Sequence, residues 1–533
     1  MKFLITLLSL ISPALLFAQE KGIDQIIDEK FGAYTGWFVK GIFYEIAFTD
    51  KISVPWVLIV LVAGALFFTF YFKVINITGF GTAINIVRGK YDEIESGGDD
   101  HVEASETVHV SDEGDILDTI RVEQDGDHHG EVSHFQALTA ALSATVGLGN
   151  IAGVAVAISI GGPGATFWMI VAGLIGMASK FTECTLGVSY REIDETGKVY
   201  GGPMYYLKKG LRDKGLAGLG KILAVVFAIM CIGGSFGGGN MFQSNQAFAM
   251  LESYTGGAES PLNGYGWLFG MVMAVLVGIV IIGGIKKIAK VTDKIVPFMV
   301  AIYVGAALMI LGIHFTEIPR AFGEIFNGAF TGAGIIGGIF GVLIQGFRRA
   351  AFSNEAGIGS ASIAHSAVKT KYAASEGLVA LLEPFIDTVL VCTMTALVLI
   401  ISNGDGTIMT YGEEVKQGVE VTSKAFASTI SWFPFVLTIA VILFAFSTMI
   451  SWSYYGYQAW SFLFGRSKKT EYLYKAIFCL FVIVGASAKL GSVIDFSDAM
   501  IFAMLVPNMI GLFILAPKVK EELAKFRQAI KKA

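Results

Sequence analysis

The chain has 533 residues, of which 54% are hydrophobic and only 16% are charged, and its formal net charge is -5. This composition, with 64 glycines and 41 phenylalanines, is typical of a polytopic all-α membrane protein and excludes a large soluble enzyme. We therefore expect the lipid bilayer as its surroundings and no nucleic-acid partner. The four cysteines stand in apolar segments without CxxC spacing, which favours small core residues over a disulfide frame or a metal site.

Residues 1–19 have the pattern of a secretory signal peptide. Lys2 supplies the positive start, residues 3–17 form an apolar run that is short for a membrane crossing, and residues 16–18 resemble a small-residue cleavage site. An uncleaved membrane anchor is the alternative. In either case the chain that follows begins outside the cytoplasm, so we expect a periplasmic N-terminus.

Eleven later segments are long or apolar enough to cross about 30 Å of hydrocarbon. The first lies near 53–73, in a leading region (20–90) that also holds a periplasmic segment and a loop. The other ten are expected at 135–159, 165–189, 222–249, 266–284, 294–313, 331–348, 375–401, 432–461, 473–488 and 497–516.

Lysine and arginine are concentrated in alternate connecting segments. Seven fall in 190–221 and four in 285–294, whereas 250–265 has none. This positive-inside bias, together with the signal peptide, indicates a multi-pass protein of the bacterial inner membrane. It also makes the basic tail, 517–533, cytoplasmic.

An acidic insert, residues 91–131, falls in a predicted cytoplasmic loop. It holds fifteen Asp or Glu residues, a single Arg and four histidines. A solvated loop or a small accessory domain is one interpretation. Cation sensing is the other, although no spacing typical of metal ligands supports it.

The ten spans of the core, 132–516, divide into two sets of five, and each set opens with a glycine-rich stretch. These stretches are 145–150 and 332–338. Five spans per half give the halves opposite orientations, so the core is expected to be an inverted repeat. Interrupted helices at corresponding places in two halves are the best sequence indication of a secondary transporter's substrate site.

The first glycine-rich stretch, 145–150, could bind a zwitterion and a cation side by side. An unwound helix exposes amide N–H groups, which suit a carboxylate, and carbonyl oxygens, which suit a weakly hydrated ion such as Na⁺. The Asn150 amide could bridge the two ligands. Close helix packing through small residues is the alternative.

Several motifs in the core resemble those of a known family. They read TVGLGNIAGVA (145–155), GGPGA (161–165), KFTE (180–183), GGPMYY (201–206), FSNEAG (352–357), EPFIDT (383–388) and FST with WSYYG (446–456). The chain is similar to the alanine/glycine:cation symporters, also called sodium:alanine symporters, over about 53–90 and 131–516. The acidic insert and the signal-like start depart from the usual pattern of that family.

The resemblance implies a five-plus-five inverted-repeat core, like that of the neurotransmitter:sodium symporters, with one extra leading helix. It implies uptake of alanine or glycine driven by Na⁺ or, in some members, by H⁺. It also implies that the substrate is bound by Gly147, Gly149, Asn150, Gln243, Gly337, Gly338 and Trp452. For Gln243 an interhelical hydrogen bond is the alternative, and for Trp452 a packing or interfacial position.

The expected ion ligands come from two helices. Ser447 and Thr448 are adjacent hydroxyls on an otherwise apolar helix, and the resemblance sets them opposite the carbonyls of Ser143 and Val146. Oxygen ligands alone fit a hard monovalent cation such as Na⁺. The alternative is that both hydroxyls bond to their own helix four residues earlier.

Charged side chains inside the membrane are expensive, and they indicate function by default. Four ionisable residues are expected there: Lys180, Glu183, Glu383 and Asp387. The last two could relay protons or pair with the arginines at 348 and 349 in a structural ion pair near the cytoplasmic gate.

The sequence therefore predicts a secondary active symporter that imports alanine or glycine with Na⁺ by alternating access, and we expect a monomer. An H⁺-coupled amino-acid symporter and a transporter-like membrane sensor are the alternatives. A channel would need a ring of repeated polar residues, which the sequence does not contain. An enzyme is not expected, because the chain has neither HExxH nor GxSxG.

Overall fold

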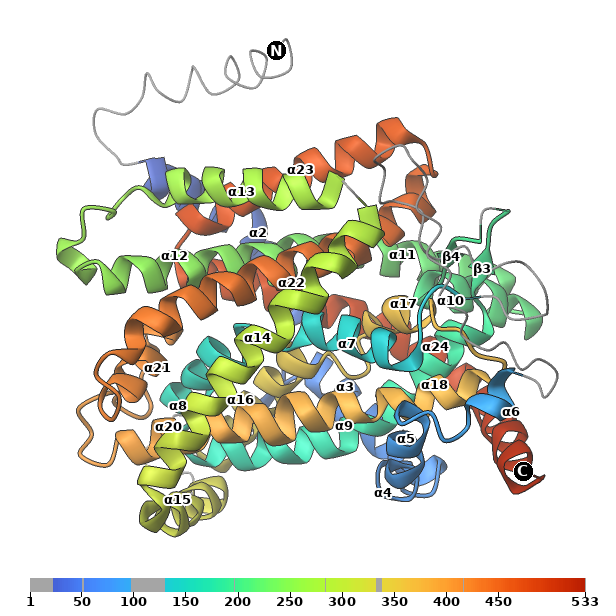
Figure 1. Ribbon diagram of the computed structural model, residues 1–533, viewed down its shortest axis with the longest axis horizontal. Coiled ribbons are helices and arrows are strands. Elements are labelled where there is room, and N and C mark those ends of the chain that lie inside the picture. The colour runs from blue at the N-terminus through green and yellow to red at the C-terminus, as the bar shows by residue number, and fades with distance from the viewer. Residues whose placement is uncertain are drawn as a thin grey trace, which may run out of the picture.

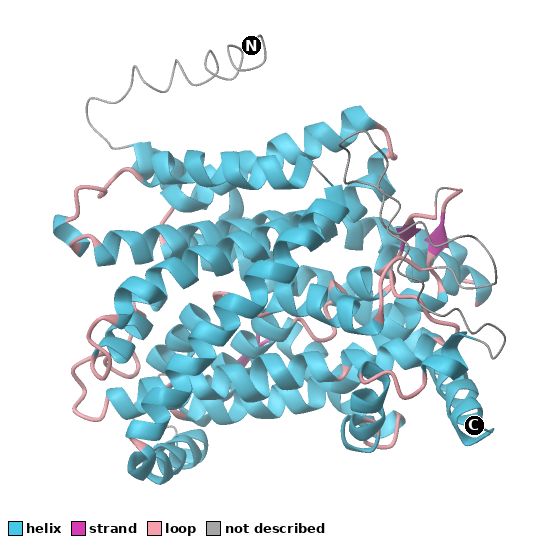
Figure 2. Ribbon diagram, in the orientation of Figure 1, coloured by secondary structure: helices cyan, strands magenta, loops and turns pink. Residues whose placement is uncertain are grey.

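The computed structural model describes residues 23–49, 52–96, 130–195, 197–282, 284–331, 338–415 and 417–532. The chain is helical over most of these residues, and the named strands form two short antiparallel pairs (Figure 2). These are β1 (Glu45–Thr49) with β2 (Ile52–Pro55) and β3 (Glu192–Ile193) with β4 (Val199–Tyr200). The predicted signal peptide and residues 97–129 of the acidic insert lie outside the described residues.

A leading group of helices precedes the core. It comprises α2 (Ile23–Ile42), α3 (Trp56–Tyr71), α4 (Ile75–Thr78), α5 (Phe80–Val87) and α6 (Asp92–Ser96). Apolar α3 coincides with the first predicted span, and the chain bends by 60° between α3 and the pair α4–α5. Lys73 and Val74 make this turn with left-handed backbone (φ 56° for both).

Long helices, drawn lengthwise in Figure 1, build the core. The first half contains α7 (His134–Thr145), η1 (Gly149–Gly153), α8 (Val154–Gly161), α9 (Gly164–Ser189), α10 (Pro203–Asp213), α11 (Ala217–Phe236), η2 (Gly237–Met241), α12 (Phe242–Tyr254), η3 (Gly257–Glu259), α13 (Gly266–Ile282) and α14 (Gly284–Ile313).

The second half begins after α14. It contains η4 (Phe315–Glu317), α15 (Ile318–Thr331), α16 (Gly338–Asn354), α17 (Ala361–His365), α18 (Ala373–Ala380), α19 (Leu382–Pro384), η5 (Phe385–Cys392), α20 (Thr393–Ser402), α21 (Gly418–Ala427), α22 (Phe433–Phe464), α23 (Lys468–Ser487) and α24 (Leu490–Lys532). In Figure 1 the helices α8, α16 and α20 lie toward the left end of the bundle, and α10, α17 and α18 toward the right.

Seven helices in the described part of the chain are long and apolar enough to cross a membrane, or nine if each of two bent pairs is one span. One bent pair is α7 with η1–α8, whose two parts differ in direction by 54°. Apolar α13, of 17 residues, is shorter. The molecule is thus a multi-pass membrane protein, whereas the full count of eleven spans stays a prediction.

Three π-helical segments interrupt long helices of the core, and each contains a buried polar residue. Asn150 lies in η1, Asn240 in η2 and Asp387 in η5, and none of the three is more than 1% exposed. Such segments occur frequently at functional sites because they disturb the regular helix bonding. The two that hold Asn150 and Asp387 meet each other in the centre of the core.

The second half opens at 355–360, and the SNEAG stretch that begins this opening, 353–357, has the pattern of an inner gate or a capped turn. Residues 332–337 of the expected glycine-rich break lie outside the described residues, and Gly338 begins α16. Helix α16 then runs without interruption to Asn354, and the chain opens between Glu355 and Ser360 before α17 starts. The last turn of α16, just before this opening, contacts the first break through Phe352 and Ser353.

Candidate substrate and ion site

The first break arises because a side chain takes the hydrogen bond that would continue the helix. The Gly147 N–H would bond to the Ser143 carbonyl in a regular helix, but it donates instead to Asn150 Oδ1 at 2.8 Å. Val146, directly after α7, has extended backbone (φ -73°, ψ 96°). The helix therefore opens at 146–148 and leaves the Ser143 carbonyl available to a partner on another helix.

That partner is α22. Thr448 Oγ1 donates to the Ser143 carbonyl at 3.4 Å, and the hydroxyls of Ser143 and Ser447 are 2.9 Å apart. The sequence reasoning missed Ser451, whose hydroxyl is 3.1 Å from that of Ser143. Three of the four expected ion ligands are thus brought together, and Val146, the fourth, lies in the adjoining open turn.

In the described part of the chain, the hydroxyls of Ser447 and Thr448 form no hydrogen bond to a carbonyl of their own helix. Other hydroxyls on α22 do form such bonds. Thr438, for example, donates to the Pro434 carbonyl at 2.7 Å. Both side chains are buried, with 0% and 2% of their surface exposed. A dry set of hydroxyl and carbonyl oxygens from two helices has the chemistry that suits Na⁺.

A cavity lies beside this oxygen cluster. It is lined by Ala144, Thr145, Gly149, Gly238, Gln243, Phe352, Glu355, Trp452 and Ile501. Three of the expected substrate residues, Gly149, Gln243 and Trp452, belong to this set. Gly338 does not, and Gly337 lies outside the described residues. The sequence reasoning missed Phe352 and Glu355, although both stand in the FSNEAG motif.

Gln243 and Trp452 both belong to the wall of the cavity. Gln243 donates from Nε2 to the Gly238 carbonyl of its own span at 3.0 Å, while its buried Oε1 has no hydrogen-bond partner. A Cβ atom built on Gly147 would lie 3.6 Å from this oxygen, so the free acceptor is next to the first break. Trp452 is 1% exposed and packs edge to face on Tyr455 at 5.4 Å.

Gly147 is held close to the oxygen cluster. A Cβ atom at this position would come within 2.7 Å of Thr448 Oγ1, closer than real Cβ contacts allow. Glycine is therefore required here by the approach of α22, and the same residue adjoins both the ion ligands and Gln243.

Asn150 has a different place from the one expected. Its Oδ1 caps the Gly147 N–H, and its Nδ2 donates to Asp387 Oδ1 at 2.6 Å and to Ser353 Oγ at 3.1 Å. Ser353 in turn donates to Asp387 Oδ2 at 2.7 Å. The amide thus ties the first break to α16 and η5, and it is absent from the cavity lining.

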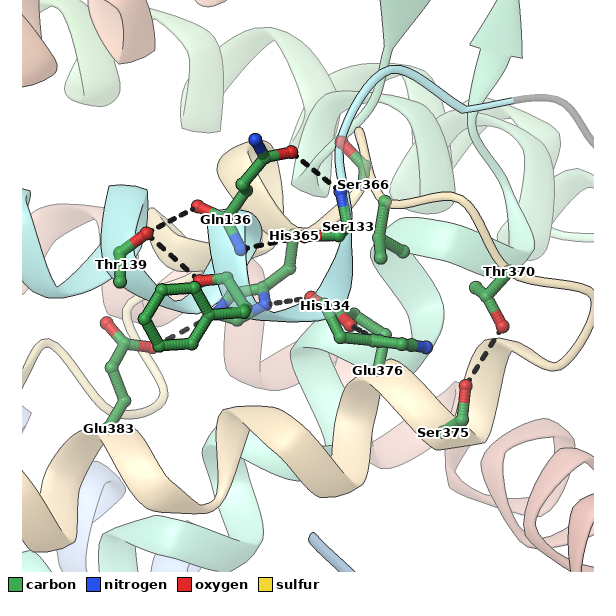
Figure 3. Close-up of polar contacts among 12 residues, drawn as sticks. Ser133, His134, Gln136, Thr139, His365, Ser366, Thr370, Ser375, Glu376 and Glu383 are labelled. Carbon is green, nitrogen blue, oxygen red and sulfur yellow. Dashed lines mark hydrogen bonds and ion pairs between the residues drawn. The ribbon is translucent and has the colours of Figure 1, made fainter. Parts of the chain in front are cut away.

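A buried chain of ionisable groups lies at the α17–α18 end of the bundle (Figure 3). His134 lies between Glu376 and Glu95, and the distance between His134 Nε2 and the Glu95 carboxylate is 2.6 Å. On the other side of Glu376 lies His365, whose Nδ1 is 2.5 Å from Glu376 Oε1 and whose Nε2 is 3.4 Å from Glu383. We call this set, extended by Lys180, the inner network.

Lys180 completes the inner network. Its Nζ is 3.4 Å from Glu383 and 3.9 Å from Glu183, and all three side chains are at most 1% exposed. Six helices, α6, α7, α9, α17, α18 and α19, are joined in this way. Removing one member of such a buried pair leaves an uncompensated charge, so the loss of one partner destabilises the packing of this end.

The expected pairing of the two arginines with Glu383 or Asp387 is wrong. Arg348 and Arg349 both contact Asp498 of α24, with 2.6 Å between Arg348 Nε and Asp498 Oδ2. Helix α16 continues past both arginines, which places them one turn before Phe352, while Glu355 and His365 come after it. Along the chain, the two charge clusters thus lie before and after Phe352, which lines the cavity.

Comparison with known proteins supports one family. The model of the sodium:alanine symporter family matches residues 104–533. The chain belongs to this family. It is 43% identical over 406 residues to the sodium/alanine symporter AgcS of Methanococcus maripaludis, covering 76% of this chain and 86% of the relative. It is 34% identical over 391 residues to the probable sodium/glutamine symporter GlnT of Bacillus subtilis, covering 73% and 77%.

A solved structure supports the fold of this sodium:alanine symporter family member. The crystal structure of MhsT in complex with L-phenylalanine matches with a TM-score of 0.54 at 15% identity, covering 73% of this chain and 90% of that one. At this identity the likeness concerns the fold alone. Family membership makes the chain an amino-acid symporter, and the family description implies Na⁺ as its coupling ion.

Proposed function

We propose that this protein imports alanine or glycine together with Na⁺ by alternating access. The observation that carries the proposal is that one short stretch, 146–149, adjoins both the oxygen cluster and the cavity. Na⁺ would be held by the hydroxyls of Ser447 and Thr448 and the carbonyls of Ser143 and Val146. The carboxylate of the amino acid would face Gly147 and Gly149, where η1 and α8 begin.

The shared stretch gives a physical reason for coupling. An ion held between Ser143 and Thr448 fixes the open turn at Gly147, and a fixed turn needs less ordering when the amino acid binds. Linkage then requires that the amino acid raise the affinity for Na⁺ by the same factor. The free Oε1 of Gln243 would accept a hydrogen bond from the bound amino acid.

The energetic scale is sufficient for accumulation. One charge moving down a potential of 100 mV supplies about 2.3 kcal/mol, and about 1.4 kcal/mol corresponds to a tenfold ratio. A single Na⁺ therefore concentrates the amino acid some tens-fold before the Na⁺ gradient itself is added.

Two charge clusters could act as the two gates of alternating access, one toward each side of the membrane. The Arg348–Arg349–Asp498 cluster ties α16 to α24, and the inner network ties α7, α9, α17 and α18. We propose that the two clusters lie on the two sides of the cavity. With eleven spans and a periplasmic N-terminus, the inner network would face the cytoplasm. Opening one cluster while the other stays closed would expose the site to one side only.

The cavity favours a small side chain. Trp452, Phe352 and Ile501 close it with bulky groups, so we propose that alanine and glycine enter and that larger amino acids are excluded sterically. We further propose that the protein acts as a monomer in the bacterial inner membrane and that the acidic insert is accessory to transport.

A proton as the coupling ion is the second candidate, because the inner network holds two histidines and several carboxylates within hydrogen-bonding distance of one another. Uptake of labelled alanine into proteoliposomes, with Na⁺ and pH gradients imposed separately, decides between them. We expect uptake with the Na⁺ gradient alone. Uptake with only the pH gradient would favour the proton, and uptake with neither would refute symport.

A further inference from the structure

Glu355 is a buried carboxylate in the wall of the cavity. It is 2% exposed and is the single Asp, Glu, Lys, Arg or His among the nine residues that line this space. It stands directly after α16, where the chain opens before α17. Gly149, Gln243 and Trp452 line the same cavity, so the carboxylate belongs to the place where we expect the amino acid.

Glu355 lacks a cationic partner. Ser360 Oγ donates to its Oε2, but no ion pair within 4.0 Å involves Glu355 among the described residues. The ammonium group of Lys180 is already shared between Glu383, at 3.4 Å, and Glu183, at 3.9 Å. A buried charge is costly unless it is paired. The wall of the cavity therefore holds a carboxyl group whose charged form needs a cation from the ligand.

The backbone at this position is unfavourable for a residue with a side chain. Glu355 has a φ of 55°, and left-handed backbone costs a non-glycine residue about 1–2 kcal/mol. Gly357 and Gly359, with φ of 83° and 99°, follow in the same opening. A glycine at 355 would avoid this cost, so the sequence has a carboxylate at a position where the backbone favours glycine. Strain of this kind is concentrated at ligand sites.

The two walls of the cavity have opposite polarity. Gly149 lies where η1 and α8 begin, and the start of a helix carries partial positive charge. Glu355 follows the end of α16, where the free carbonyls carry partial negative charge. A zwitterion fits this arrangement in one orientation, with its carboxylate toward Gly149 and its ammonium toward Glu355.

We propose that the carboxylate of Glu355 binds the ammonium group of the substrate and so restricts transport to acids with a free, protonated α-amine. This inference rests on the proposed function. It predicts that Glu355 distinguishes alanine from lactate, which has a hydroxyl in place of the amine, whereas the carboxylate side of the site treats both alike.

The test compares two ligands on two proteins. Displacement of labelled alanine from the purified full-length protein, at saturating Na⁺, gives the affinities of alanine and lactate for the wild type and for Glu355→Gln. We expect the wild type to prefer alanine by roughly 100-fold or more, as for a fully desolvated charge pair. In Glu355→Gln, alanine affinity should fall by about that factor and lactate affinity should change little.

Glu183→Gln is the matched control, because Glu183 is a buried carboxylate that does not line the cavity. It should leave the ratio of the two affinities unchanged. If Glu355→Gln does not fold, Glu355→Asp and the wild type suffice: the aspartate should keep a preference for alanine, and equal binding of alanine and lactate by the wild type would overturn the proposal.

Two results with Glu355→Gln would also overturn it. Unchanged alanine affinity would mean that Glu355 is protonated, since glutamine resembles the neutral acid. Equal losses for both ligands would mean a structural role. Failure of the wild type to bind alanine at all would instead refute the proposed function, and this inference with it.

Discussion

Replacing Thr448 by valine tests the ion site with little change in shape. The substitution removes Oγ1, the atom that contacts the Ser143 carbonyl at 3.4 Å, and puts a methyl group in its place. A hydrogen bond or ligand contact to a charged group contributes about 1.5–3 kcal/mol. At about 1.4 kcal/mol per tenfold, the Na⁺ concentration for half-maximal alanine uptake should rise roughly 10- to 100-fold.

Thr438→Val provides the control on the same helix. Thr438 is 4% exposed, close to the 2% of Thr448, but its hydroxyl donates to the Pro434 carbonyl and faces no second helix oxygen. Its replacement should leave the Na⁺ dependence within twofold of the wild type. The assay is uptake into proteoliposomes at increasing external Na⁺. Equal Na⁺ dependence for the two variants would refute the assignment of Thr448 as an ion ligand.

Three further outcomes follow. Gly147→Ala should abolish Na⁺-dependent uptake, because its Cβ would come within 2.7 Å of Thr448 Oγ1, whereas Gly153→Ala, with nothing within 4 Å, should stay active in the same assay. Glu376→Gln should lower the free energy of unfolding by about 3–5 kcal/mol, measured as reduced thermal stability in detergent, since both histidines of the inner network lose their shared partner. Glu420→Gln, in an exposed pair with Lys424, should cost at most about 1 kcal/mol. Excess leucine or phenylalanine should fail to displace labelled alanine where glycine succeeds, and equal displacement would contradict a size-limited cavity.

The first break and a loop at 353–357 could both be predicted from the sequence, whereas residues 332–337 of the second glycine-rich stretch lie outside the described residues. Glycine permits an open turn but does not enforce one, and what opens the chain at 146–148 is the capping of Gly147 by the Asn150 side chain. A comparable motif with asparagine, SNEAG, marks the opening after α16.

The contacts between distant segments needed the structure or the family resemblance. Ser143 and Ser447 are 304 residues apart, and nothing local to either hydroxyl indicates the other. The resemblance supplied that pair correctly. The resemblance did not indicate that Arg348 and Arg349 pair with Asp498. The sequence alone favoured carboxylates that are nearer along the chain, because apolar segments do not reveal which helices become neighbours.

Mutual dependence of Na⁺ and alanine binding tests the central claim most directly. Equilibrium binding of labelled alanine to the purified protein should be measured at increasing Na⁺, and Na⁺ binding at increasing alanine. If both ligands share the stretch 146–149, each should raise the affinity for the other by the same factor. Alanine affinity that is independent of Na⁺ would contradict the account.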